Sequence, residues 1–153
     1  MMGKFFSKFK YILFPLILGA LVGFIISSSM DYSDLSKPFL SPPGFIFPIV
    51  WSILYILMGI SYGLLVKKDL NTSEVQNIYY LQLLVNLIWP ILFFTFNLRL
   101  FSFLWILLLD VLIIIMIIQF YKKNKISAIL QLPYLFWSLF ASYLNLGIYI
   151  LNK

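Results

Sequence analysis

The stretch PFLSPPGFIFPIVWSILYILMGISYGLLV, residues 38–66, decides the fold class because it contains no charged side chain. A helix that crosses a bilayer needs about 20 mostly apolar residues. The part that follows the prolines at 42 and 43 meets this requirement. The sequence therefore predicts a membrane-spanning helix over residues 44–66.

Similar windows lie on both sides of this stretch, and charged residues separate them. Hydrophobic residues make up 63% of the 153-residue chain and charged residues 10%, whereas soluble proteins carry about 25% charged residues. We therefore predict an all-α fold, a single domain over residues 1–153 that is an integral membrane bundle of five transmembrane helices. The other four predicted helices are 9–30, 76–96, 99–121 and 126–151.

The basic residues indicate an orientation in the cell membrane. Eight lysines fall on the side that holds the N-terminus, and three basic residues fall on the other side. By the positive-inside rule, the N-terminus is cytoplasmic and the C-terminus lies outside. The basic residues mark helix ends and form no single polar face, so no nucleic-acid partner is expected. The first group is Lys4, Lys8, Lys10, Lys67, Lys68, Lys122, Lys123 and Lys125; the second is Lys37, Arg99 and Lys153.

Cysteine and histidine are both absent from the sequence. Their absence excludes disulfides, zinc and iron–sulfur ligation by these residues, and nucleophiles that depend on them. We expect no metal site and no cofactor.

Three predicted helices carry aromatic, amide and small residues at steps of three or four, which places them on one face of each helix. Amides in hydrocarbon need partners, so these faces should point inward. One interpretation is a cavity for a large, flat, apolar molecule, because aromatic faces stack on π-systems. The other is ordinary packing. The residues are Phe47, Trp51 and Tyr55; Asn86, Trp89 and Phe93; and Trp137, Ala141 and Leu144.

Two further features leave alternatives open. The segment 31–43 contains Pro38, Pro42 and Pro43, and it is either a semi-rigid lid over the cavity or a plain connector. Asp110 lies near the middle of a predicted helix, where a charge costs at least ~2.5 kcal/mol. It is either functional or a protonated carboxyl bonded to a neighbouring carbonyl.

Several separated motifs resemble the TspO/MBR family, the translocator proteins or tryptophan-rich sensory proteins. They are YSDLSKPFLSPP at 32–43 and FPIVWSILYILMG at 47–59, followed by Gln82-Leu83, Asn86 and Trp89-Pro90. PYLFW at 133–137 and the residues Phe140-Ala141 and Leu144-Asn145 complete the pattern. Scarce Arg beside abundant Lys, Ile and Asn is typical of a Bacillus-type bacterial member.

The resemblance implies a five-helix bundle, commonly a homodimer, whose pocket opens toward the loop between the first two helices. It also implies porphyrin ligands such as protoporphyrin IX, and benzodiazepine-site drugs. In the loop, Lys37 is expected to pair with a porphyrin propionate. The positions that match the family's pocket motifs are Tyr32, Pro42, Trp51, Asn86, Trp89, Trp137, Ala141 and Leu144.

Three functions remain open. The first is a membrane receptor or carrier for porphyrins. The second is light-dependent degradation of protoporphyrin IX, in which Trp51 and Trp137 are the catalytic electron donors. The third is a structural membrane protein without a ligand.

Small residues suggest where a homodimer forms. Gly19, Gly23 and Ser27 make a ridge on the first helix, and close packing of this kind holds helices together in lipid. Gly59 and Gly63 make a second ridge, on the helix that carries the aromatic face. We expect the first ridge to contact the second copy. The alternative, which the resemblance allows, is a contact through the third helix.

Overall fold

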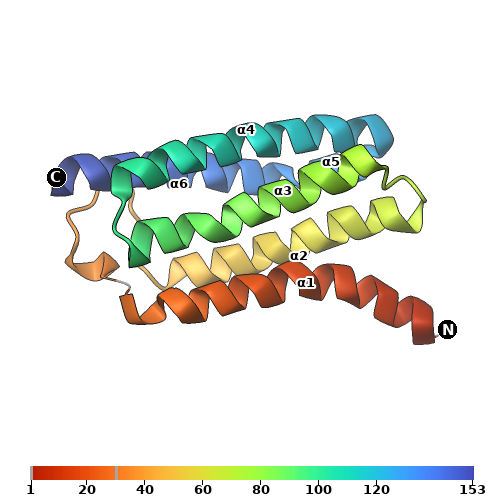
Figure 1. The fold of residues 1–153 in the computed structure, drawn as a ribbon, viewed down its shortest axis with the longest axis horizontal. Coiled ribbons are helices and arrows are strands. Elements are labelled where there is room, and N and C mark those ends of the chain that lie inside the picture. The colour runs from red at the N-terminus through yellow and green to blue at the C-terminus, as the bar shows by residue number, and fades with distance from the viewer. Residues whose placement is uncertain (1, 30) are drawn as a thin grey trace.

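The computed structural model describes residues 2–29 and 31–153. This part of the chain contains helices and no strand. Five helical spans, taken over α5 and α6 together, are long and apolar enough to cross a membrane. They lie side by side along the long axis, with the two termini at opposite ends (Figure 1). The predicted all-α bundle of five transmembrane helices is confirmed.

The helices follow one another with short connections. The long helix α1 is followed by a 3₁₀ turn, η1, and a second such turn, η2, lies in the loop before α2. The helix α3 continues directly into a π-helical segment, η3. The bounds are α1 Met2–Ile26, η1 Ser27–Ser29, η2 Tyr32–Asp34, α2 Ile46–Lys67, α3 Ser73–Pro90, η3 Ile91–Thr95, α4 Arg99–Lys123, α5 Lys125–Ile129 and α6 Leu132–Asn152.

The helix ends differ from the predicted ones by one to several residues, and two of the differences are the largest. The predicted helix 126–151 is interrupted after Ile129, and α6 restarts with Pro133 in its first turn. Proline lacks an N–H and fits best at a helix start, which explains the break. At the other end of the chain, α1 is already helical at Met2 and ends at Ile26. The predicted end at residue 30 lies outside the described residues, as do the side chains of Lys4 and Lys8.

The five spans form a closed ring in the order α1, α2, α6, α4 and α3, and α3 returns to α1. The contact between α1 and α2 is close because Gly59 faces the backbone of Tyr11 and Ile12. Gly19 lies against the Tyr55 ring. The glycines therefore pack the bundle itself.

The small-residue ridge on α1 is divided between the interior and the surface of the bundle. Gly19 faces Tyr55 of α2, and Gly23 lines an internal cavity. Gly23 and Ser27 are exposed, and a Cβ at Gly23 would meet no atom within 4 Å. The expected contact of this ridge with a second copy therefore stays a prediction.

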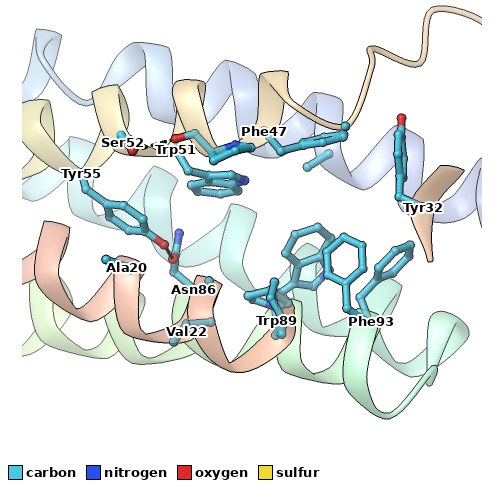
Figure 2. A pocket seen from close by; sticks show the side chains of 18 of the residues that line it. Ala20, Val22, Tyr32, Phe47, Trp51, Ser52, Tyr55, Asn86, Trp89 and Phe93 are labelled. Atoms are coloured by element: carbon cyan, nitrogen blue, oxygen red, sulfur yellow. Dashed lines mark hydrogen bonds between the residues drawn. The ribbon is translucent and has the colours of Figure 1, made fainter. Parts of the chain in front are cut away.

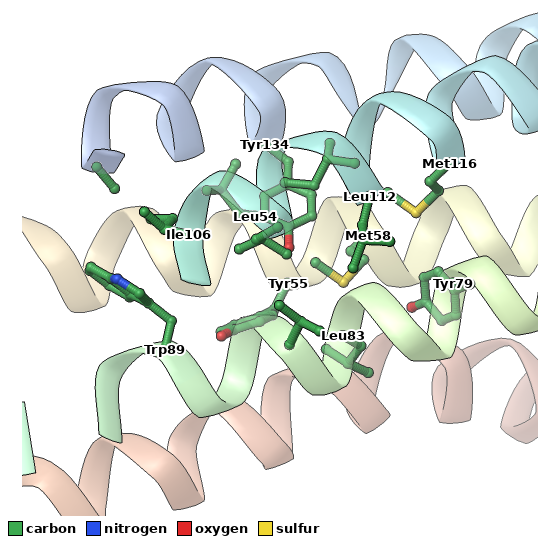
Figure 3. Packing of buried hydrophobic residues seen from close by; sticks show 14 of the residues in the cluster. Leu54, Tyr55, Met58, Tyr79, Leu83, Trp89, Ile106, Leu112, Met116 and Tyr134 are labelled. Carbon is green, nitrogen blue, oxygen red and sulfur yellow. The ribbon is translucent and has the colours of Figure 1, made fainter. Parts of the chain in front are cut away.

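The interior is filled by large apolar side chains from α2, α3, α4 and α6 (Figure 3). Tyr62 and Tyr79 stack with ring centroids 4.2 Å apart. Asp110 is 4% exposed and lies between α4 and α6. Its two carboxyl oxygens accept hydrogen bonds from Ser138 Oγ at 2.5 Å and Ser142 Oγ at 2.6 Å. The partners of Asp110 are thus two hydroxyls, and it lies away from the cavity described next.

Candidate functional site

A cavity of about 450 Å³ lies inside the bundle, between α1, α2, α3, η3 and α6. Ligand sites typically measure about 300–1,000 Å³. Figure 2 shows side chains from several helices converging on it. Nine of the twelve predicted site residues line it: Tyr32, Phe47, Trp51, Tyr55, Asn86, Trp89, Phe93, Ala141 and Leu144.

Two aromatic walls face each other across the cavity (Figure 2). On α2, Trp51 stacks on Tyr55 with ring centroids 5.8 Å apart. On the opposite side, Trp89 stacks on Phe93 with centroids 5.6 Å apart. The arrangement is suited to a flat, apolar guest, because both walls offer ring faces for offset stacking.

A chain of hydrogen bonds fixes the inner end of the cavity. Tyr55 Oη donates to Asn86 Oδ1 at 2.6 Å, and Asn86 Nδ2 donates to Tyr134 Oη at 2.8 Å. Tyr134 in turn donates to Gln82 Oε1 at 2.7 Å. The inner end is therefore rigid, because these buried polar groups satisfy one another's hydrogen bonds and neither lipid nor apolar side chains could replace those bonds.

A second set of hydrogen bonds orients Trp89. Its indole Nε1 donates to Asn145 Oδ1 at 2.9 Å. Ser102 Oγ donates to the same oxygen at 3.1 Å, and Asn145 Nδ2 donates to the Arg99 carbonyl at 2.8 Å. Asn145 also lines the cavity. The predicted site omitted it, although an amide beside Leu144 on the inward face was a usable signal.

The loop between α1 and α2 closes one end of the cavity through Tyr32. Its hydroxyl donates to the Pro42 carbonyl at 2.7 Å, and its ring packs edge-on against Phe47 at 5.1 Å. Burial raises the pKa of this Tyr32 hydroxyl, so it stays protonated and keeps this bond at neutral pH. Lys37 Nζ lies 4.8 Å from the Tyr32 ring centroid. Lys37 and Pro42 thus support Tyr32 and do not line the cavity.

Trp137 is the third predicted residue that does not line the cavity. Its ring lies 5.9 Å from Phe47, which does, and 5.5 Å from Phe140. The indole Nε1 is buried and has no hydrogen-bond partner within the described part of the chain. Phe47 therefore separates Trp137 from the cavity in this conformation.

Sequence reasoning missed the wall that α1 contributes. This wall is apolar and built largely from small or aliphatic residues, so it carries no aromatic or amide stripe. The small side chains leave room for the cavity. The residues are Leu16, Gly19, Ala20, Val22, Gly23 and Ile26.

The sequence pattern of the TspO/MBR family matches residues 11–151, nearly the whole chain. The chain belongs to the TspO/MBR family. This TspO/MBR protein is a multi-pass membrane protein, and the resemblance drawn from its separated motifs is confirmed.

Individual relatives of this TspO/MBR protein agree over most of their length. The tryptophan-rich protein TspO of Archaeoglobus fulgidus is 38% identical over 92% of this chain and 94% of its own. The protein of the same name from Chlorobaculum tepidum is 36% identical over 82% and 81%. The human translocator protein is 32% identical over 74% and 70%.

The hydrogen-bond chain in this TspO/MBR protein predicts the effect of Tyr134→Phe. The change leaves the amide of Asn86 and the oxygen of Gln82 each without a partner. We expect a loss of about 1–2 kcal/mol of stability, since a hydrogen bond between membrane helices is worth ~0.6 and at most ~1.7 kcal/mol. Thermal unfolding in detergent measures it. Tyr121→Phe, the same change at a side chain that is 58% exposed, should be neutral; equal midpoints for the two variants would contradict the prediction.

Proposed function

We propose that this TspO/MBR protein is a membrane receptor or carrier that binds a flat, apolar tetrapyrrole such as protoporphyrin IX in the cavity between its aromatic walls. The observation that carries the proposal is the pair of facing walls, Trp51 with Tyr55 and Trp89 with Phe93. Ring faces favour an extended π-system over a branched aliphatic molecule. Flat ligands of the benzodiazepine-site type meet the same requirement.

The polar groups set the orientation of the guest. The inner end offers the fixed Tyr55 and Asn86 pair, the amide of Asn145 is engaged by Trp89, and most of the wall is apolar. A porphyrin's propionates therefore belong at the loop end, where Lys37 lies against Tyr32. A charged propionate is better solvated there than among the helices.

Protoporphyrin IX titration tests the proposal. In nanodiscs, bound porphyrin should quench the indole fluorescence, and Trp51→Leu should weaken binding about three- to tenfold, since an aromatic pair is worth ~0.5–1.5 kcal/mol beyond its buried area. Trp105→Leu is the matched control because Trp105 donates to the Val85 carbonyl and lies outside the cavity wall. Equal affinities for the two variants would sink the proposed site.

Light-dependent degradation of protoporphyrin IX is the second candidate function. The supporting observation is that two oxidisable side chains, Trp51 and Tyr55, stack at the cavity wall. Illumination of the same complexes is the test. Loss of the porphyrin absorption band that requires Trp51 favours the degradation, and a stable band favours the receptor or carrier. The position of Trp137 behind Phe47 makes a Trp137→Phe change less damaging than Trp51→Phe.

We also propose that the N-terminus is cytoplasmic and that the protein is a homodimer. The supporting observation for the orientation is the excess of lysine at one end of the bundle. For the dimer, the supporting observation is that Gly23 and Ser27 of the α1 ridge are exposed. A contact through the third helix, α3, is the alternative.

A further inference from the structure

The helix α2 begins well inside the bundle. Phe47, its second residue, packs against Trp137, whose ring centroid is 5.9 Å away. Trp137 lies 15 residues before Asn152, the last residue of α6, which is about 22 Å along a helix. Figure 1 likewise shows α2 starting short of the end that α6 reaches. The place beside α6 that a longer α2 would occupy is therefore filled by residues of the loop between α1 and α2.

These residues descend along α6 through three contacts. Ser36 exchanges two hydrogen bonds with Asn152, of 2.7 and 3.1 Å. Pro38 lies over Gly147 so closely that a Cβ at Gly147 would be 2.5 Å from Pro38 Cγ. The Phe39 carbonyl accepts a hydrogen bond from Tyr143 Oη at 2.7 Å. Tyr143 lies nine residues before Asn152, about 13 Å deeper along the helix.

That depth is greater than the thickness of a headgroup layer. A bilayer is ~40–45 Å thick with a ~30 Å hydrocarbon core, which leaves about 5–8 Å for each polar layer. The charged residue at the C-terminal end of α6 is Lys153, which follows Asn152. Tyr143 is 43% exposed on the bundle surface. The contact with Phe39 thus forms on the lipid-facing side. With Asn152 placed at the outer edge of the headgroup layer, Tyr143 lies at the level of the hydrocarbon.

Irregular backbone at this depth must have its polar groups satisfied within the protein. Three prolines, at 38, 42 and 43, have no N–H to satisfy. The Pro38 carbonyl accepts from Ser41 N at 3.3 Å and Ser41 Oγ at 2.7 Å. The Pro42 carbonyl accepts from Tyr32 Oη. The carbonyls at positions 38, 39 and 42 are therefore each satisfied by a side-chain hydroxyl of the protein.

The side chains at the turn are large, apolar and exposed. Phe39 is 81% exposed, Leu40 67% and Phe45 66%. Leu40 also has a φ of 72°, in the left-handed region that favours glycine over a branched side chain. In water, an exposed leucine at this position would bury no apolar surface to offset the backbone strain.

We propose that residues 38–45 form a non-helical segment embedded in the leaflet at the C-terminal end of α6, with Phe39, Leu40 and Phe45 in contact with lipid acyl chains. The partner is the bilayer itself. The segment is a lipid-facing part of the bundle wall, and it holds Tyr32 at the cavity from the membrane side.

Because the chain has no cysteine, a single fluorophore can be placed by Leu40→Cys and, separately, by Phe45→Cys. In nanodiscs, brominated acyl chains should quench both labels severalfold more strongly than aqueous iodide does. Ser33→Cys, in the exposed part of the same loop, should show the opposite preference, and Leu139→Cys, 45% exposed on α6 one turn before Tyr143, should match Leu40→Cys.

The proposal is overturned if the labels at 40 and 45 follow the label at 33. Each labelled variant is compared with the unlabelled protein by thermal unfolding, so that a misfolded variant is recognised. The two positions carry the test independently, because Leu40 lies in the strained turn and Phe45 next to α2. The measurement needs no porphyrin, so its outcome is separate from that of the proposed function.

Discussion

Gly59→Ala is expected to destabilise the protein by about 3 kcal/mol, at the upper end of the usual range for overpacking. The added methyl group would lie 2.5 Å from Ile12 Cα and 2.9 Å from Ile12 N. These are backbone atoms of α1, so no side-chain rotation relieves the overlap. The helix α1 must move away from α2 as a whole. Thermal unfolding in detergent, followed by circular dichroism, measures the loss.

Gly63→Ala is the matched control, since it makes the same change one turn further along α2. There the new methyl group would lie 3.6 Å from Tyr11 Cβ, an ordinary contact. Alanine is favoured over glycine in a helix by up to about 1 kcal/mol, so this variant should be as stable as the parent or more so. Similar unfolding midpoints for the two alanine variants would show that α1 and α2 do not pack closely at Gly59.

Gly147→Leu is expected to speed the release of bound protoporphyrin IX by at least about tenfold, equivalent to about 1.4 kcal/mol. The leucine would occupy the place of Pro38 and push the loop away from α6. Tyr32, which closes the cavity from that loop, would move with it. Displacement of bound porphyrin by an excess of competitor, followed by indole fluorescence, gives the off-rate.

Leu146→Phe provides the comparison for that experiment. It enlarges the residue next to Gly147 on α6, whereas the contacts between α6 and the loop are made by Tyr143, Gly147 and Asn152. It should leave the off-rate near that of the parent. An unchanged off-rate in Gly147→Leu, with a porphyrin affinity equal to that of the parent, would mean that the loop does not retain the ligand.

Much of the fold followed from elementary features of the sequence. Charged residues rarely occur in hydrocarbon, so the positions of lysine and arginine bounded the five spans correctly to within a few residues. The break at Leu130 and Gln131 was missed because the flanking residues are apolar on both sides and the signal is one proline. The descent of the loop along α6 depends on Tyr143, Gly147 and Asn152, far away in sequence, and local patterns do not reveal it.

The site was predictable to the extent that its residues are distinctive. Trp51 and Asn86 stood out because aromatic rings and amides are conspicuous on an apolar helix. The α1 wall is ordinary apolar sequence, so only tertiary packing reveals it. Trp137 shares the inward face of α6, yet helical periodicity cannot tell that the Phe47 ring would stand in front of it.

The hydrogen bonds of Asp110 also bear on how the chain is made. Its two hydroxyl partners follow it by 28 and 32 residues, which take about 1–6 s to synthesise at ~5–20 residues per second. During that interval α4 carries an unpartnered carboxyl at its centre, which opposes entry into the bilayer by ~2.5–3.5 kcal/mol. The rest of α4 is strongly apolar and favours entry. At about −0.3 to −0.6 kcal/mol for each Leu, Ile, Phe or Val, these residues outweigh the cost of the carboxyl. α4 therefore enters the bilayer first, and the hydrogen bonds to Asp110 form only when α6 arrives beside it.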